Sequence, residues 1–179
     1  GEYGTGMIRV TFAAMPRRIT VLTAKAAVVS GLVLAAGTVA VLISVLTGRL
    51  VLPGNGFRVD VMSLGDGPVL RAAAGSVLYL VLVGLLSVGI AVLARDAAAA
   101  IGIVLGLLYL FPIVASVVGD PDWYRRLQQI SPMNAGLAVQ ATTDLSAQPH
   151  TPWAGLGVLA AWAGGALVAG GLTLRVRDV

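Results

Sequence analysis

Four uncharged stretches of 23 residues each constrain the fold of this 179-residue chain more than any other feature. They are Ala26–Gly48, Ala72–Ala94, Ala97–Gly119 and Pro152–Leu174. At about 1.5 Å of rise per residue, a helix of this length crosses the roughly 30 Å hydrocarbon core of a bilayer. A charge at mid-bilayer costs about 2.5–3.5 kcal/mol, and here charges stand only at the edges of the stretches. The sequence predicts an all-α polytopic membrane protein with four transmembrane helices, the first starting near residue 23.

Composition agrees with a membrane protein and excludes several kinds of site. Hydrophobic residues make up 58% of the chain, whereas soluble domains have roughly 45–50%. The chain contains no cysteine, which excludes disulfides, thiolate metal sites and thiol nucleophiles. Its isoelectric point of about 10.1 comes from Lys and Arg beside the spans, where topology and anionic headgroups account for them. We therefore expect the lipid bilayer, and no nucleic acid, as a partner.

The chain begins in polar sequence, with Gly1-Glu2-Tyr3 and no basic-then-apolar signal segment. Either the N-terminus is a soluble segment, or the chain is the C-terminal part of a longer protein, which is the interpretation we favour. We expect one transmembrane domain over 1–179, with a cytoplasmic segment at 1–22 and an extracytoplasmic loop at 120–151.

The distribution of cations predicts the orientation. With both termini in the cytoplasm, the inner segments 1–25, 95–96 and 175–179 hold seven of the 12 cations in 32 residues. The outer segments 49–71 and 120–151 hold the other five in 55 residues. Because Lys and Arg concentrate on the cytoplasmic side of short loops, we expect both termini inside the cell.

The connections carry clear helix-start signals. Arg95-Asp96 predicts a tight turn in which Asp96 caps the next helix. Asp120-Pro121 and Ser131-Pro132 each place a capping residue before a proline at the first helical position. They predict two short amphipathic helices at the outer interface, the first with Trp123, Leu127 and Ile130 on one face. A plain solvent-exposed loop is the alternative.

Small residues recur at helical spacing in the last two spans: Gly102, Gly106, Gly157, Ala161, Gly165 and Ala169. Such spacing lets helix backbones approach closely. We expect it to mark packing within the chain, with a dimer interface as the less favoured alternative.

Motifs for chemistry are missing from the sequence. It contains no phosphate-binding loop ending in Lys-Ser/Thr, no Gly-x-Ser-x-Gly elbow and no His-Glu-x-x-His helix. The spans also contain no Asp, Glu, Lys, Arg or His, the groups that proton-coupled carriers use. We therefore expect no catalytic residue, no metal ligand and no cofactor bound by this chain, which would not be an enzyme.

The N-terminal segment 1–25 is the most unusual stretch. Thr5 can start a short helix that ends before Pro16. Its apolar side holds Met7, Ile8, Phe12 and Met15, with Arg9 and Thr11 elsewhere on its surface. One interpretation is an interfacial helix anchored by Arg17 and Arg18. The other is a docking helix whose apolar side chains fit the groove of a cytoplasmic partner.

A family resemblance favours the docking interpretation. The segment contains Glu2-Tyr3, Gly6, Ile8-Arg9, Thr11, Ala13, Pro16-Arg17-Arg18 and Ala24-Lys25. Later pieces are Pro68-Val69-Leu70-Arg71, Gly75-Ser76-x-Leu78-Tyr79, Leu93-Ala94-Arg95, Ala99-Ala100-Ile101-Gly102 and Ser131-Pro132-x-Asn134-Ala135-Gly136. Together they resemble the membrane subunits of bacterial type-2 ATP-binding-cassette exporters, and the N-terminal run is the most specific part.

The resemblance implies a permease subunit in the bacterial cell membrane. The chain would supply helices three to six of a six-helix domain and lack the first two. The segment at about 5–15 would be the coupling helix seated on a separate ATPase subunit, which binds ATP and Mg²⁺. A second permease chain, identical or different, would complete the pathway, and the short helices of the last outer loop would be re-entrant elements near its exit.

Two other classes remain open at the level of sequence. The first is a non-transporting membrane protein, such as an immunity, assembly or scaffold subunit. The second, less favoured, is an ion-coupled secondary transporter, since a sodium site built from carbonyls and hydroxyls needs no charged side chain in the spans.

Overall fold

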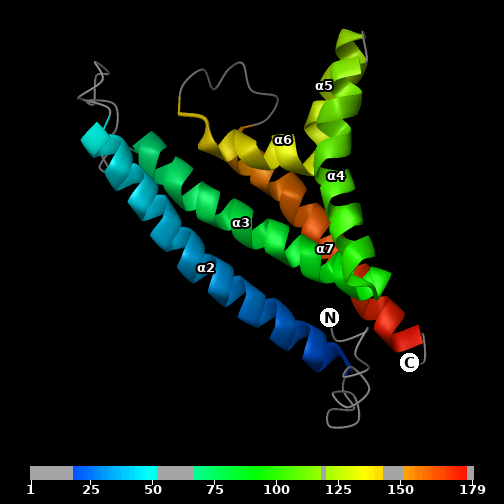
Figure 1. The fold of residues 1–179 in the computed structure, drawn as a ribbon. Coiled ribbons are helices and arrows are strands. Elements are labelled where there is room, and N and C mark those ends of the chain that lie inside the picture. The colour runs from blue at the N-terminus through cyan, green and yellow to red at the C-terminus, as the bar shows by residue number, and fades with distance from the viewer. Residues whose placement is uncertain (1–17, 52–66, 118–119, 143–150, 177–179) are drawn as a thin grey trace.

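The computed structural model describes residues 18–51, 67–117, 120–142 and 151–176. The described chain is helical throughout apart from short connections. Its four long helices are α2 (Arg18–Val51), α3 (Gly67–Ala94), α4 (Ala97–Val117) and α7 (Pro152–Val176). Two short helices, α5 (Pro121–Ile130) and α6 (Pro132–Leu137), and the 3₁₀ turn η3 (Ala138–Gln140) stand between α4 and α7 (Figure 1).

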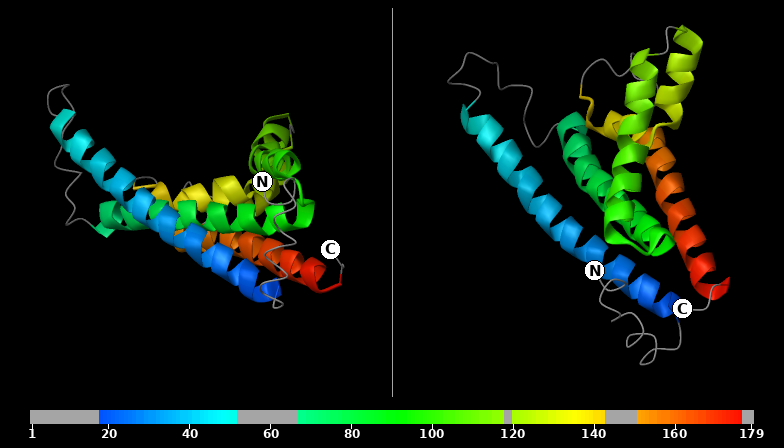
Figure 2. Two further views of the ribbon diagram at one scale, coloured as in Figure 1. Left: turned by 60° about the horizontal axis from the view of Figure 1, so that its bottom comes forward. Right: turned by 45° about the vertical axis from the view of Figure 1, so that its right-hand side comes forward.

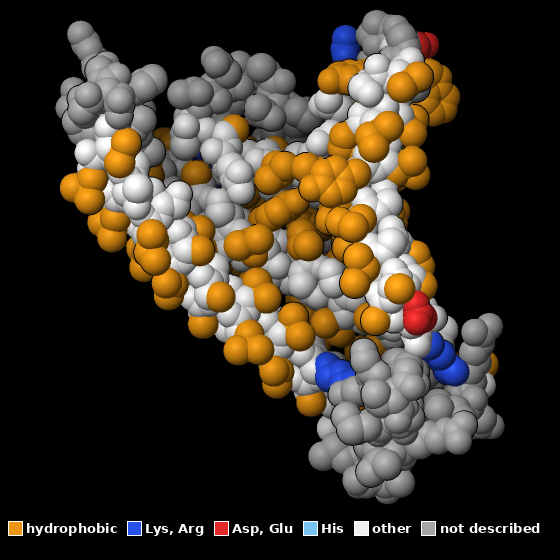
Figure 3. Space-filling view, in the orientation of Figure 1, with side chains coloured by type: hydrophobic (Ala, Val, Ile, Leu, Met, Phe, Trp, Pro, Cys, Tyr) orange, Lys and Arg blue, Asp and Glu red, His pale blue; other side chains and the backbone are white. Residues whose placement is uncertain are grey.

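All four long helices are long and apolar enough to cross a membrane, which confirms the predicted fold class. Large hydrophobic side chains stay exposed along them, for example Leu32 at 66% and Ile43 at 58% in α2. A soluble protein rarely exposes apolar patches of this size. On the face shown in Figure 3, the charged side chains lie at the two ends of the helices, and hydrophobic side chains lie between them. The protein is therefore a polytopic helical membrane protein.

The long helices extend further than the uncharged stretches. α2 has 34 residues, which corresponds to roughly 51 Å, far more than the hydrocarbon core. It begins at Arg18, before the start near residue 23 that the sequence predicts, so the residues that precede the first span belong to the same helix. Such a helix accommodates its length by tilting or by projecting beyond the bilayer.

The helices alternate in direction. The start of α2, the Arg95–Asp96 turn between α3 and α4 and the end of α7 lie together, and we call this the proximal end (Figures 1 and 2). The opposite, distal end carries α5, α6 and the start of α7. This arrangement matches the predicted number of crossings, although it does not by itself assign a side of the membrane to either end.

The core lies between α3, α4 and α7. α3 packs most extensively on α7, and α2 covers another part of α3. Buried side chains from the three helices meet in one cluster: Leu86, Ile90, Ala100, Leu159 and Ala163. α4 leans away from α2, so that the two form the arms of a V with α3 and α7 between them (Figure 1).

Capping accounts for the short elements. Asp120 accepts hydrogen bonds from the amides of Asp122 at 2.8 Å and Trp123 at 3.5 Å, and thereby starts α5. Ser131 ends α5, because its amide donates to the carbonyl of Leu127, and starts α6, because its hydroxyl accepts from Asn134 at 3.3 Å. The two helices predicted from Asp-Pro and Ser-Pro are thus confirmed, in place of an irregular loop.

The tight turn between α3 and α4 is also confirmed. The carboxylate of Asp96 accepts a hydrogen bond from the amide of Ala99 at 2.7 Å, which caps α4. Arg95 turns the chain with φ of 56°, a left-handed conformation that side chains other than glycine rarely adopt.

Candidate functional site

The predicted docking residues Thr5, Met7, Ile8, Arg9, Thr11, Phe12, Met15 and Arg17 lie outside the described residues. Arg18 is the first residue of α2, and its side chain also lies outside the description. The predicted coupling helix is therefore neither supported nor contradicted. What the structure adds is the surface onto which this segment leads, namely the proximal end of α2.

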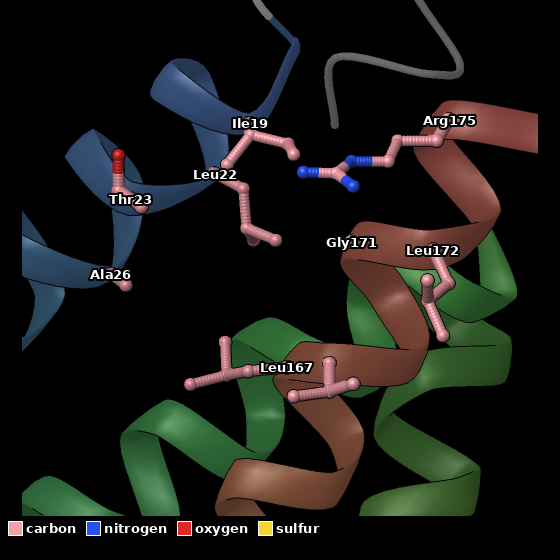
Figure 4. Close-up of a pocket in the computed structure, with 9 residues that line it drawn as sticks. Ile19, Leu22, Thr23, Ala26, Leu167, Gly171, Leu172 and Arg175 are labelled. Atoms are coloured by element: carbon pink, nitrogen blue, oxygen red, sulfur yellow. The ribbon is translucent and has the colours of Figure 1, made fainter.

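A groove lies at the proximal end between α2 and α7. It has a volume of about 380 Å³ and is lined by Ile19, Leu22, Thr23, Ala26, Leu167, Val168, Gly171, Leu172 and Arg175. Figure 4 shows the α2 side chains on one wall, the α7 side chains on the other, and the guanidinium of Arg175 extending across towards Ile19. The walls are almost entirely apolar, and Arg175 is the charged group in the lining.

At the distal end, α6 and η3 are seated against both α3 and α7. Ser131, Pro132, Ala135 and Val139 are buried there. A side chain added at Gly75 of α3 would overlap Val139, and one added at Gly155 of α7 would overlap the carbonyl of Ala135. Glycine at these two positions lets α6 and η3 lie against the backbones of the long helices.

One arginine ties the start of α3 to this seat. The Nη2 of Arg71 donates a hydrogen bond to the carbonyl oxygen of Ala141 at 2.7 Å, just after η3. Its Nε atom is buried and has no hydrogen-bond partner among the described residues. The charge that marks the edge of the second uncharged stretch therefore also fixes the end of the α6–η3 segment.

Trp162 of α7 connects the short distal helix α5 to the core. Its indole nitrogen donates to the carbonyl of Ile130, the last residue of α5, at 3.0 Å. Its ring meets the ring of Phe111 of α4 edge to face, with centroids 6.2 Å apart. A buried tryptophan usually finds an acceptor for its indole N–H, and aromatic rings often pack edge to face, so both contacts are of the expected kind.

A second hollow, of about 630 Å³, opens between α3, α4 and α7. Its lining is apolar and includes Ile90, Leu107, Ala161, Trp162 and Gly165. Within the described parts of the chain, no group of His, Cys, Asp and Glu is arranged to hold a metal ion. The described residues that line the two hollows are mostly apolar and include no nucleophile with a base beside it. Because of this apolar lining, both hollows are suited to apolar or amphiphilic molecules.

The prediction about small residues was wrong in its particulars. Gly102, Gly106, Gly157 and Gly165 have open space where a side chain would be. Close packing occurs instead at Gly89 of α3, where an added Cβ would lie 2.6 Å from the backbone carbon of Ala166. In a chain with 23 glycines, regular spacing alone did not identify the glycines in contact.

Several structural residues were missed by the sequence reasoning. Gly89 and Gly170 face each other across α3 and α7, with an added Cβ at Gly170 lying 3.1 Å from the carbonyl oxygen of Gly89. Gly89 has leucine four residues away on either side, so no small-residue spacing marks it, whereas Gly170 stands four residues after Ala166. Trp162 carried a usable signal, since a tryptophan inside an apolar span requires a partner for its N–H.

Comparison of the chain with protein-family models, curated proteins and solved structures finds no match. The expectation of a permease family therefore rests on the residues quoted from the sequence.

Proposed function

We propose that this chain is a membrane permease subunit of an ATP-driven exporter and couples to a separate ATPase through residues 5–15. It would form part of the translocation pathway together with a second permease chain, in the bacterial cell membrane, with its termini in the cytoplasm. ATP and Mg²⁺ would be bound by the ATPase.

The observation that carries the proposal is the pair α5–α6. The resemblance implies paired helices in the last outer loop, and the structure has two capped short helices between α4 and α7, with α6 seated on α3 and α7. Many membrane proteins place only a flexible connection between neighbouring spans. A built helix pair at the end opposite the start of α2 supports a role in the pathway.

The continuity of α2 supports the coupling role. Because α2 runs from Arg18 to Val51 without interruption, a displacement at its first turn is transmitted along a rigid element. A partner bound just before Arg18 would act at one end of this helix. Each nucleotide state of that partner shifts the permease only by its differential affinity for the inward and outward forms.

The Phe12→Asp variant tests the docking role. A charge in the centre of the proposed apolar face should prevent its burial in the groove of the ATPase. We expect export, and stimulation of the ATPase by the permease, to fall to background, while membrane insertion stays normal. The measurement is the ATPase activity and transport of the complete gene product co-reconstituted with its ATP-binding-cassette ATPase.

Two controls make this experiment decisive. Phe12→Leu keeps an apolar side chain and should retain most of the coupling. Residues 1–179 contain no cysteine, so Phe12→Cys introduces the only thiol in this part of the protein. It should cross-link to the ATPase, whereas Asp122→Cys at the distal end should not. Normal export by the Phe12→Asp variant would reject the docking role. Failure of the wild-type protein both to export and to stimulate the ATPase would favour a non-transporting protein.

A further inference from the structure

The groove between α2 and α7 points to a ligand that the proposed function does not include. At this end α2 and α7 both pack against α3. Leu22 of α2, Val92 of α3 and Leu174 of α7 form a small buried cluster there. Beside this cluster the two helices separate, and the groove begins. Gly171 belongs to the α7 wall, and an added Cβ there would lie 3.7 Å from the Cδ2 of Leu22 on the α2 wall.

The dimensions of the groove suit a hydrocarbon chain. Along α2 the lining extends from Ile19 to Ala26, which corresponds to about 10 Å along the helix axis. One leaflet of the hydrocarbon core is about 15 Å deep, half of the bilayer core. The groove is therefore shorter than one leaflet. On α7 its lining runs from Leu167 to Leu172 inside the fourth uncharged stretch and ends at Arg175 just beyond it, so the groove lies where the hydrocarbon core meets the headgroups.

The charge at the groove is positive. Arg175, in the last turn of α7, extends across the groove towards α2 (Figure 4). Among the described residues, Lys25 and Arg95 also carry positive charge at the proximal end, and Asp96 is the acidic residue there. The Asp96 carboxylate caps α4 through Ala99, and no described acid pairs with Arg175. A ligand that complements this end carries a negative charge above an apolar tail.

We propose that the groove binds one anionic phospholipid, with an acyl chain between α2 and α7 and its phosphate at the guanidinium of Arg175. The bilayer itself supplies this ligand, and a guanidinium is well suited to bind phosphate oxygens. If the proximal end is cytoplasmic, as predicted, it faces the leaflet in which anionic lipids attract basic residues. The proposal does not require an ATPase partner.

Native mass spectrometry of the complete protein in detergent tests the proposal, with phosphatidylglycerol and phosphatidylcholine of the same acyl chains as probes. We expect the wild-type protein to retain phosphatidylglycerol about fivefold more strongly, the factor expected for one basic residue at an anionic surface. Arg175→Gln should abolish this preference, and Arg175→Lys should retain part of it. Arg125→Gln, at the distal end, is the matched control and should leave the preference unchanged.

A second variant tests the apolar part of the groove. Gly171→Leu should fill part of the groove from its α7 wall and weaken the binding of both lipids, whereas Gly164→Leu, on the same helix with open space around it, should not. Thermal unfolding of each variant in detergent checks that it is folded. If Arg175→Gln and Gly171→Leu both bind the two lipids as the wild-type protein does, the proposal is wrong. It is also wrong if Gly171→Leu changes from dimer to monomer with unchanged lipid binding, because a second copy would then occupy the groove.

Discussion

Single residues at the ends of the spans do more than mark the membrane boundary. Arg71 lies near the start of α3 and Ser131 lies between α5 and α6, and each satisfies a backbone group of the short distal elements. Ser131 is fully buried, although serine is usually exposed. Its hydroxyl and amide together fix the angle between α5 and α6.

Arg71 provides a prediction at the scale of one residue. Replacing it by Met removes a charge-assisted hydrogen bond and leaves the carbonyl of Ala141 without its donor. Such a bond contributes about 1.5–3 kcal/mol, so we expect a comparable loss in the free energy of unfolding. The measurement is denaturant unfolding in mixed micelles.

The matched control for Arg71→Met is Arg125→Met on the exposed surface of α5. Surface substitutions of this kind usually change stability by less than about 0.5 kcal/mol. Equal stability of the two variants would show that the contact between Arg71 and Ala141 contributes nothing to the fold.

At the scale of helices, two kinds of glycine have to be distinguished. Gly89 and Gly170 permit the backbones of α3 and α7 to touch, whereas Gly157 and Gly102 face open space. The sequence shows both kinds in the same apolar background. Only the relative placement of two helices decides which glycine is needed, and that placement depends on contacts far apart in the chain.

The two kinds of glycine should respond oppositely to substitution by alanine. In Gly89→Ala the new methyl group would overlap the backbone of Ala166 and Leu167, which cannot move like the tip of a side chain. We expect a loss of about 1–3 kcal/mol in stability, the usual effect of overpacking. Gly157→Ala should be neutral or gain up to about 1 kcal/mol from helix propensity.

Thermal unfolding of both variants in detergent checks this prediction, with the wild-type protein measured alongside. Stability of Gly89→Ala equal to that of Gly157→Ala would mean that α3 and α7 do not approach each other as closely as described.

The whole molecule was predictable to the extent that local signals determine it. The four spans followed from charge-free length, and α5 and α6 followed from a capping residue before a proline. These signals act within one helix, so a single sequence contains them. The grooves and the contact between Gly89 and Gly170 arise from the packing of several helices, and no local pattern encodes them. The docking residues before Arg18 lie outside the described chain, so that part of the site stays a prediction.

The orientation of the whole molecule can be measured directly. Because residues 1–179 contain no cysteine, labelling of Thr20→Cys at the proximal end and of Asp122→Cys at the distal end can be compared directly with that of the unsubstituted protein. We expect a membrane-impermeant maleimide to label Asp122→Cys in intact cells and Thr20→Cys only after permeabilisation. This result follows from the excess of cations at the proximal end.

A cysteine at Tyr109, within the third span, is the control and should stay unlabelled in both conditions. Labelling of Thr20→Cys from outside intact cells would reverse the topology. It would also remove the possibility that a cytoplasmic ATPase binds the segment before α2.

The seating of α6 and η3 has a mechanical consequence. α3 and α7 are joined at two places, backbone to backbone at Gly89 and Gly170 and through the short helix beyond Ser131. Two helices that are held together at two places cannot rotate against each other unless one of these contacts breaks. Any large rearrangement of this molecule therefore falls to α2 and α4, which would swing about a stationary central pair.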